Sequence, residues 1–241
     1  MGRKRLEYWR DVEGYQNYIF DSREGKKRIE EMEKYYPEFK DFLGKRVLDV
    51  ACGAGLFTFW LERKGFEVIG VDINKEMIKL ALKTRKKYKF KSQFLLSDAA
   101  NVKLKGIFDS AIILGNSILG LSPKTFVNII KNIKTHLRED GYVIINYRSV
   151  VEKMFNKEWK DVYFDSENIV SFNLKYDDSQ AEITKIYVDL NGEKLPTKES
   201  FYVWSSGFLE AMMEALGFRL VKRIETKVSM CEIMDIYQKI S

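Results

Sequence analysis

The chain has 241 residues, 45% of them hydrophobic and 32% charged, with a formal net charge of +6. This composition indicates a sizeable core under a heavily charged surface. Only Cys52 and Cys231 are cysteines, so neither a disulfide framework nor a metal-ligand spacing is present, and we expect no metal site. No secretory signal follows the basic start, and no apolar run approaches the roughly 18 residues of a membrane span. We therefore expect a cytoplasmic protein.

Residues 6–43 carry aromatic and apolar residues at helical spacing, which predicts two or three helices. Apolar strands and amphipathic helices then alternate, and this alternation indicates a parallel, doubly wound α/β sheet. The expected strands are 46–51, 67–72, 92–97, 108–114 and 141–147. The expected helices are 56–64, 75–88 and 123–138, with a turn or short helix near 98–103. Gly141 is expected to end the third of these helices and to start the fifth strand.

The pattern changes after the fifth strand. Residues 162–203 alternate with period two between turn signals such as Asn191-Gly192, which predicts an antiparallel β meander. A helix is then expected over 205–216, closed by Gly217. Two further strands, 218–225 and 229–239, complete the expected elements.

A glycine-rich turn between the first strand and its helix is the main functional signal. Asp49 ends an apolar run, and Gly53 and Gly55 follow at positions where a ligand could approach the backbone closely. Asp72 lies 19 residues after Gly53, at the tip of the second strand, where a carboxylate can bind the two hydroxyls of a ribose. These residues predict a ligand that contains a nucleoside.

The details of this run decide which nucleoside ligand is expected. A dinucleotide fingerprint needs a third glycine where this chain has Thr58. The segment Leu48-Asp49-Val50-Ala51-Cys52-Gly53-Ala54-Gly55 instead resembles the first motif of the class I S-adenosylmethionine-dependent methyltransferases, with Ala51 where glycine is commoner. The final helix and strand pair also resemble this class. The resemblance implies a Rossmann-like, seven-stranded, mostly parallel sheet with S-adenosyl-L-methionine as the cofactor, and an antiparallel β insertion after strand five.

The resemblance assigns roles to individual residues. Asp49, Ala51, Gly53 and Gly55 are expected around the methionine and ribose parts of the cofactor, and Asp72 at the ribose hydroxyls. The residues expected at the adenine are Ile73, Met77, Asp98 and Ala99. Leu114 and Tyr18 complete the expected cofactor-binding set. For Asp72 and Asp98, a helix N-cap is the alternative role.

The fourth strand ends at Leu114-Gly115-Asn116-Ser117, beside the expected position of the transferable methyl group. This sequence resembles the glycine N-methyltransferase group and lacks the Asn/Asp-Pro-Pro-Tyr/Phe motif of enzymes that methylate base amino groups. Asn116 is the candidate catalytic residue; it either binds the acceptor or only shapes the loop.

By the same resemblance, four parts of the chain are expected. Residues 1–45 would form an N-terminal helical lid, 46–150 the cofactor-binding core, 151–204 a substrate chamber, and 205–241 the helix and strand pair that complete the sheet.

We expect methyl transfer to nitrogen or oxygen of a small molecule. The lysine-rich stretch from Lys75 to Lys91 and the pI near 9.0 leave methylation of tRNA or another RNA as the alternative, and a non-catalytic cofactor-binding protein as a further one. The oligomeric state is left open.

Overall fold

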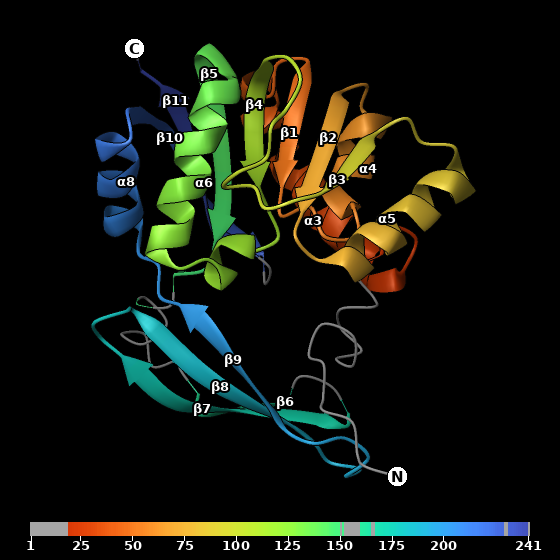
Figure 1. Cartoon of the computed structure of the whole chain (residues 1–241), viewed down its shortest axis with the longest axis vertical. Helices are drawn as coiled ribbons and strands as arrows, with labels where there is room; N and C mark the ends of the chain where they lie inside the picture. The colour runs from red at the N-terminus through yellow and green to blue at the C-terminus, as the bar shows by residue number, and fades with distance from the viewer. Residues whose placement is uncertain (1–18, 150, 152–159, 165–166, 229–230, 241) are drawn as a thin grey trace.

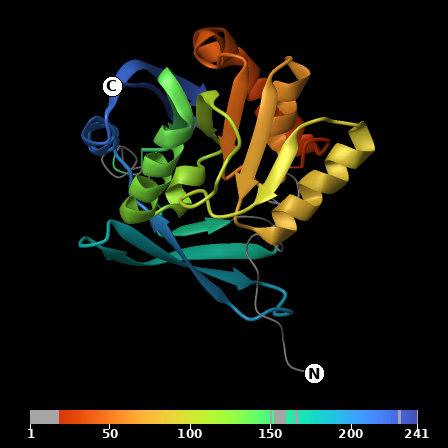
Figure 2. The same cartoon turned by 45° about the horizontal axis from the view of Figure 1, so that its top comes forward.

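Two β-sheets form the framework of the molecule (Figure 1). The structure is a computed structural model that describes residues 19–149, 151, 160–164, 167–228 and 231–240. A seven-stranded sheet with helices on both faces makes the body. A four-stranded antiparallel sheet lies beyond the carboxyl ends of its parallel strands, and the tilted view in Figure 2 shows the same arrangement.

The large sheet has the strand order β10-β11-β5-β4-β1-β2-β3. Its strands are β1 (Arg46–Val50), β2 (Glu67–Asp72), β3 (Gln93–Leu96), β4 (Phe108–Ile113), β5 (Leu137–Tyr147), β10 (Phe218–Val228) and β11 (Cys231–Lys239). Strands β1 to β5 are parallel, and β11 runs antiparallel to both β5 and β10. The strand order reverses between β1 and β4, so the loops that follow these two strands diverge and leave a crevice at their carboxyl ends. The expected seven-stranded, mostly parallel sheet is confirmed.

The helices cover the sheet in two layers. They are α3 (Arg23–Phe39), α4 (Leu56–Arg63), α5 (Lys75–Tyr88), α6 (Pro123–His136) and α8 (Ser206–Ala215), with short 3₁₀ helices η1 (Lys40–Phe42) and η2 (Ser117–Gly120). Side-chain oxygens of Ser22, Asn74, Ser122 and Ser205 cap the N-termini of α3, α5, α6 and α8. Asn74, and not Asp72, is therefore the N-cap of α5.

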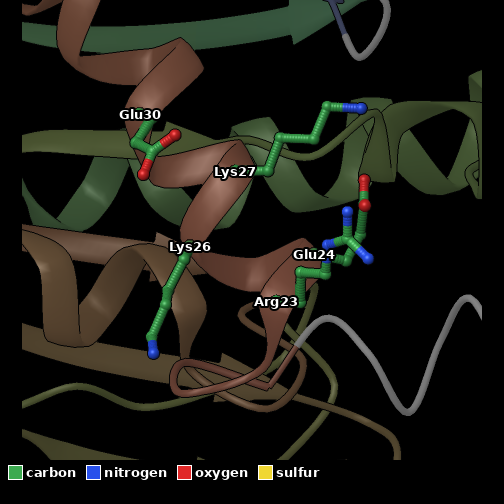
Figure 3. A pocket seen from close by; sticks show the side chains of 5 residues that line it. All are labelled: Arg23, Glu24, Lys26, Lys27 and Glu30. Atoms are coloured by element: carbon green, nitrogen blue, oxygen red, sulfur yellow. The ribbon is translucent and has the colours of Figure 1, made fainter.

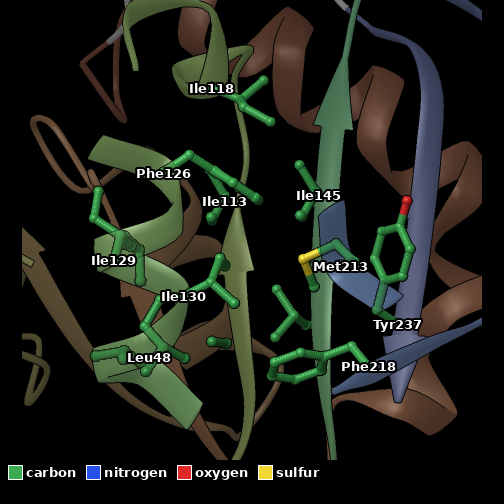
Figure 4. Packing of buried hydrophobic residues seen from close by; sticks show 14 of the residues in the cluster. Leu48, Ile113, Ile118, Phe126, Ile129, Ile130, Ile145, Met213, Phe218 and Tyr237 are labelled. Carbon is green, nitrogen blue, oxygen red and sulfur yellow. The ribbon is translucent and has the colours of Figure 1, made fainter. Parts of the chain in front are cut away.

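The core lies on both faces of the large sheet. On one face, α6 packs against β4 and β5 through Phe126 and Ile130, while α8 contacts β10 and adds Met213 to the same apolar layer, next to Phe218 (Figure 4). On the other face, α3 and α4 bury a second apolar layer that includes Met32, Phe39 and Trp60. Phe218 lies at the start of β10. The two layers hold the carboxyl ends of β1, β2 and β4 in fixed positions.

The expected boundary between α6 and β5 was wrong. Helix α6 ends at His136 and β5 begins at Leu137, with a register irregularity between Phe108 and Ser110 of the neighbouring strand β4. The residue with positive φ is Asp140, at 56°, and not Gly141. A Cβ on Gly141 would lie 2.9 Å from the carbonyl oxygen of Arg138, so this position needs glycine for close backbone packing and not as a helix C-cap.

The small sheet is the predicted antiparallel meander. Its strands are β6 (Val162–Phe164), β7 (Ile169–Asp177), β8 (Glu182–Asp189) and β9 (Thr197–Tyr202), paired in that order. Near residues 98–103 the chain makes turns and no helix. Of the predicted N-terminal helices, α3 and η1 are described; residues 1–18, which contain Tyr18, lie outside the described residues.

Candidate active site

The glycine turn after β1 uses the left-handed backbone conformation three times. Ala51, Gly53 and Gly55 have φ values of 55°, 54° and 82°. Alanine at this conformation costs about 1–2 kcal/mol, which explains why glycine suits position 51 better. Gly55 also has an internal reason to be glycine, because a Cβ there would lie 2.8 Å from the Phe94 ring.

Asp49 lies under this turn, wholly buried near the end of β1. The hydroxyl of Thr58, on α4, donates a 2.5 Å hydrogen bond to Asp49 Oδ2. Burial raises the pKa of the Asp49 carboxyl to about 7; the Thr58 hydrogen bond opposes this shift, and the nearby charge of Asp72 adds to it. Thr58 stands where a dinucleotide fingerprint has its third glycine, and it is the hydrogen-bond partner of the buried Asp49.

Asp72 ends β2 and connects two loops. Its Oδ2 accepts a hydrogen bond from the backbone N–H of Gly53, and its Oδ1 accepts one from Asn74, both at 2.7 Å. Burial raises the pKa of this carboxyl, and the backbone donors reduce the rise. Each carboxylate oxygen has two lone pairs, so both oxygens can also accept hydrogen bonds from a ligand's hydroxyl groups.

The four residues expected at the adenine differ in exposure. Ile73 is 73% exposed directly after Asp72, whereas Met77 is buried on α5. Asp98 accepts hydrogen bonds from the backbone N–H of Ala100 and the side chain of Asn101, at 2.9 and 3.0 Å, so it shapes a turn instead of capping a helix. Ala99 is half-buried in that turn. Ile73 therefore follows β2, and Asp98 follows β3, at the carboxyl ends of these two strands.

The loop after β4 carries the candidate acceptor residues. Leu114 is buried, and Asn116 has a φ of 62° at the start of η2. The backbone N–H of Asn116 donates a 3.1 Å hydrogen bond to Oδ1 of Asn146, which is fully buried on β5. The Ser117 hydroxyl donates to the Leu114 carbonyl at 2.8 Å and lies 3.5 Å from the Ala51 carbonyl. This loop is therefore fixed against both β5 and the glycine turn.

A pocket joins the glycine turn to this loop. It is lined by Arg28, Asp49, Ala51, Cys52, Gly53, Ala54, Leu56, Phe57, Leu114, Gly115 and Ser117. The structure brings Asp49, Ala51, Gly53 and Leu114 together in this lining, while Asp72 reaches it through Gly53. Burial raises the pKa of the Cys52 thiol, so this thiol stays protonated at neutral pH.

Arg28 is the cation in the lining of this pocket, and no sequence pattern predicted it. It lies on α3, more than twenty residues before the glycine turn, and no motif links it to that turn. Ser117 and Asn146 were also missed, because only the fold brings them to the Leu114 loop.

A second hollow lies along the polar face of α3 (Figure 3). It is lined by Arg23, Glu24, Lys26, Lys27 and Glu30, and its side chains point in different directions around the helix. It shares no residue with the pocket at the glycine turn. Its lining is a solvated helix face of mixed charge, so we assign no site to it.

The pocket fits the chemical groups of S-adenosylmethionine. Arg28 suits its methionyl carboxylate, and the Asp49 carboxylate suits the positive charge of the ammonium or sulfonium group. Asp72 and the exposed Ile73 suit a ribose and the face of a purine. Tyr18, the remaining expected contact, lies outside the described residues.

Comparison with known proteins agrees with this geometry. The family model described as "Methyltransferase domain" matches residues 42–192, and the chain belongs to this family. Its fold and relatives make it a member of the class I S-adenosylmethionine-dependent methyltransferases, whose cofactor is S-adenosyl-L-methionine.

Three similar proteins show the extent of the likeness. Glycine N-methyltransferase from Oryctolagus cuniculus is 31% identical over 142 residues, which cover 51% of this chain and 48% of the relative. The tRNA (uracil(54)-C(5))-methyltransferase from Pyrococcus horikoshii is 32% identical over 131 residues, covering 54% of this chain and 30% of the relative. The solved PH0226 protein from Pyrococcus horikoshii shares the fold, with a TM-score of 0.76, 24% identity, and coverage of 97% of this chain and 99% of the other. The chain spans about half or less of the length of these curated relatives.

The described helices include none that is both long and apolar enough to span a membrane.

Proposed function

We propose that this protein transfers a methyl group from S-adenosylmethionine to nitrogen or oxygen of a small molecule. The observation that supports it best is the Asp72–Gly53 hydrogen bond, which joins an acid suited to a ribose to the turn that lines the pocket. The likeness of the Leu114–Ser117 loop to the glycine N-methyltransferase group favours a small acceptor.

In this proposal the chain's residues bind and orient the reactants. The cofactor supplies a methyl carbon that its sulfonium group already activates, so no metal or nucleophilic triad is needed. Arg28, Asp49 and Asp72 would hold the cofactor. The loop with Asn116 lies where an acceptor would approach, and Asn116 either contacts the acceptor or maintains the loop through its bond to Asn146. Alignment of the reactants can be worth effective molarities of about 10⁵ M or more.

RNA is the second candidate acceptor. Helix α5 exposes Lys75, Lys79, Lys83, Lys86 and Lys87. A basic helix face of this kind suits a phosphate backbone. However, Lys79 pairs with Glu76 and Lys87 with Asp21, so part of this charge is already compensated. We therefore favour the small-molecule acceptor.

Two measurements test the proposal in sequence. Isothermal titration calorimetry with S-adenosylhomocysteine should show binding, and NAD⁺ should not bind, because Thr58 replaces the third glycine of the dinucleotide motif. Methyl transfer from radiolabelled S-adenosylmethionine is then measured on a pool of metabolites and on purified tRNA. Methylation in the metabolite fraction supports the proposal. Robust methylation of tRNA with none in the metabolite fraction would show that RNA is the acceptor.

A further inference from the structure

Most buried side chains of the four-stranded sheet lie on one face. Ile169, Ile183 and Tyr187 are 4%, 6% and 1% exposed, whereas Phe164 on the other face is 79% exposed. Side chains alternate between the two faces along each strand, so the odd-numbered residues of β8 and β9 share the buried face with those of β7 as far as Asn173, where a bulge shifts the register. The strand pairing adds Tyr163 of β6, which lies opposite Ser171. We call this buried face the inner face.

Polar atoms on the inner face lack hydrogen-bond partners. Ser171 is fully buried and its Oγ has no partner in the structure. Asn173 donates from its Nδ2 to the Lys160 carbonyl at 2.8 Å, but its Oδ1 is buried without a partner. Glu199 makes no hydrogen bond or ion pair with any described residue, and burial raises the pKa of its carboxyl to about 7. Buried polar groups are almost always hydrogen-bonded, so the two buried oxygen atoms of Ser171 and Asn173 call for an explanation.

Two aromatic rings of the inner face lie around a lysine side chain. Lys185 lies on β8, and its Nζ is 4.2 Å from the ring centre of Tyr163 on β6 and 5.8 Å from that of Phe201 on β9. Lys185 is the direct cross-strand neighbour of Glu199 but leans onto the rings, so it leaves the Glu199 carboxylate unpaired.

One end of the small sheet lies beside the acceptor loop. Strand β9 packs against η2, which begins directly after Asn116. Trp204, two residues after β9, is fully buried in the core between the large sheet and α6. Figures 1 and 2 both show the small sheet crossing below the carboxyl ends of the parallel strands.

We propose that the inner face binds the methyl acceptor, and that this acceptor is a small molecule with an amine and neighbouring hydroxyl groups. The inference rests on the proposed methyl transfer and adds the substrate class. All three polar groups can accept hydrogen bonds, and an amine with hydroxyl neighbours provides several donors at once. Glu199 is suited to the amine, and Asn173 and Ser171 to the hydroxyl groups. Ser171 and Asn173 lie on β7 and Glu199 lies on β9, two strand spacings away, which is about 10 Å, the size of a single sugar ring with its substituents.

The test compares Glu199→Gln with Glu193→Gln, the same change at an exposed glutamate in the turn after β8. Both variants and the wild type are given S-adenosylmethionine and matched pairs of probes: aminohexoses and amino alcohols, and the same molecules with hydroxyl in place of the amine. Formation of S-adenosylhomocysteine is measured as a function of probe concentration, and the dissociation constant of S-adenosylhomocysteine is measured separately.

The proposal expects turnover of amine probes and not of their hydroxyl partners. Glu199→Gln should raise KM for the amine probe tenfold or more, leave the dissociation constant of S-adenosylhomocysteine unchanged, and retain the wild-type melting temperature, while Glu193→Gln should change none of these. Equal KM values for the two variants would overturn the assignment of Glu199. Tight binding of S-adenosylhomocysteine without turnover of any amine probe would overturn the acceptor class but leave the cofactor site intact. Loss of S-adenosylhomocysteine binding in the wild type would instead refute the proposed function itself.

Discussion

The backbone N–H of Gly53 donates a 2.7 Å hydrogen bond to Oδ2 of Asp72, so the glycine turn after β1 and the tip of β2 form one unit. The second oxygen of Asp72 accepts the N–H of Asn74, which caps α5. One carboxylate therefore sets the position of the turn, the strand tip and the helix start before any ligand binds. A ligand that binds Asp72 meets a site whose backbone is already arranged.

Replacement of Asp72 tests this unit. Asp72→Ala removes the acceptor of two backbone donors and the proposed acceptor of two ribose hydroxyls. A hydrogen bond to a charged group is worth about 1.5–3 kcal/mol, so the dissociation constant of S-adenosylhomocysteine should rise about 10- to 150-fold by calorimetry. Asp41→Ala, at an exposed aspartate of η1, is the control and should bind like the wild type. An unchanged dissociation constant in Asp72→Ala would remove the ribose assignment.

Arg28 offers a second test, with a control on the same helix. Arg28→Ala should weaken S-adenosylhomocysteine binding by tenfold or more, because the methionyl carboxylate loses a charge-assisted hydrogen bond. Lys27→Ala removes the neighbouring cation, which is exposed and lines the hollow of Figure 3 instead. Its binding should stay at the wild-type level. Equal losses in the two variants would mean that only the general positive charge of α3 matters.

The buried carboxyl of Asp49 should make stability depend on pH. Its folded-state pKa is about 7 and its ordinary value is 3.8, so the folded state holds a proton that the unfolded state releases between these values. The free energy of unfolding therefore falls as pH rises from about 4 to 7, by up to about 4 kcal/mol from this group. Asp49→Asn has no carboxyl group to lose this proton, so its free energy of unfolding should not fall in this way. Urea unfolding at pH 4.5 and pH 8 should therefore show that the free energy of unfolding of the variant, relative to that of the wild type, is higher at pH 8 than at pH 4.5. Parallel stability curves for the two proteins would contradict the shifted pKa.

A buried ionic cluster joins β5, β10 and β11. Asp235 has no exposed surface and accepts hydrogen bonds from Arg223 at 2.7 and 2.9 Å, from Tyr147 at 2.9 Å and from Tyr237 at 3.0 Å. Asp235→Ala leaves these donors without their acceptor and should lower the free energy of unfolding by about 3–5 kcal/mol, measured in urea. Glu139→Ala breaks an exposed ion pair with Lys239 and should cost about 1 kcal/mol or less. A loss of only about 1 kcal/mol in Asp235→Ala would mean that the cluster adds little stability.

Local pattern was enough to predict the order and type of the elements. Apolar strands alternating with amphipathic helices led to the parallel sheet, and period-two segments led to the meander, because both signals arise from neighbouring residues. The boundary at Gly141 was wrong for a tertiary reason: the carbonyl oxygens of Arg138 and Asp109 leave no room for a side chain there, and nothing in the local sequence records that contact.

The residues of the candidate site fall into two groups: those that the sequence predicted and those that only the fold brings to the site. The sequence placed Asp49, Gly53 and Asp72 together because Asp49 and Gly53 share one loop and Asp72 follows at the spacing of a strand–helix–strand unit; their roles at the cofactor stay predictions. Arg28 and Asn146 were not predicted, because the packing of α3 and the pairing of β5 with β4 bring them to the site from distant parts of the chain. Thr58 was noticed only as a missing glycine, and its role appears when its hydroxyl is seen to face Asp49.

The small sheet is inserted in the sequence between β5 and α8, so every residue of the glycine turn and of the β2 tip precedes it in the chain. Substitutions in the sheet therefore change no residue that lines the pocket at the glycine turn. Within such an architecture a lineage can exchange one acceptor for another while its methyl donor stays constant. Laboratory evolution of new acceptor specificity in this protein should accordingly begin with libraries confined to residues 160–203.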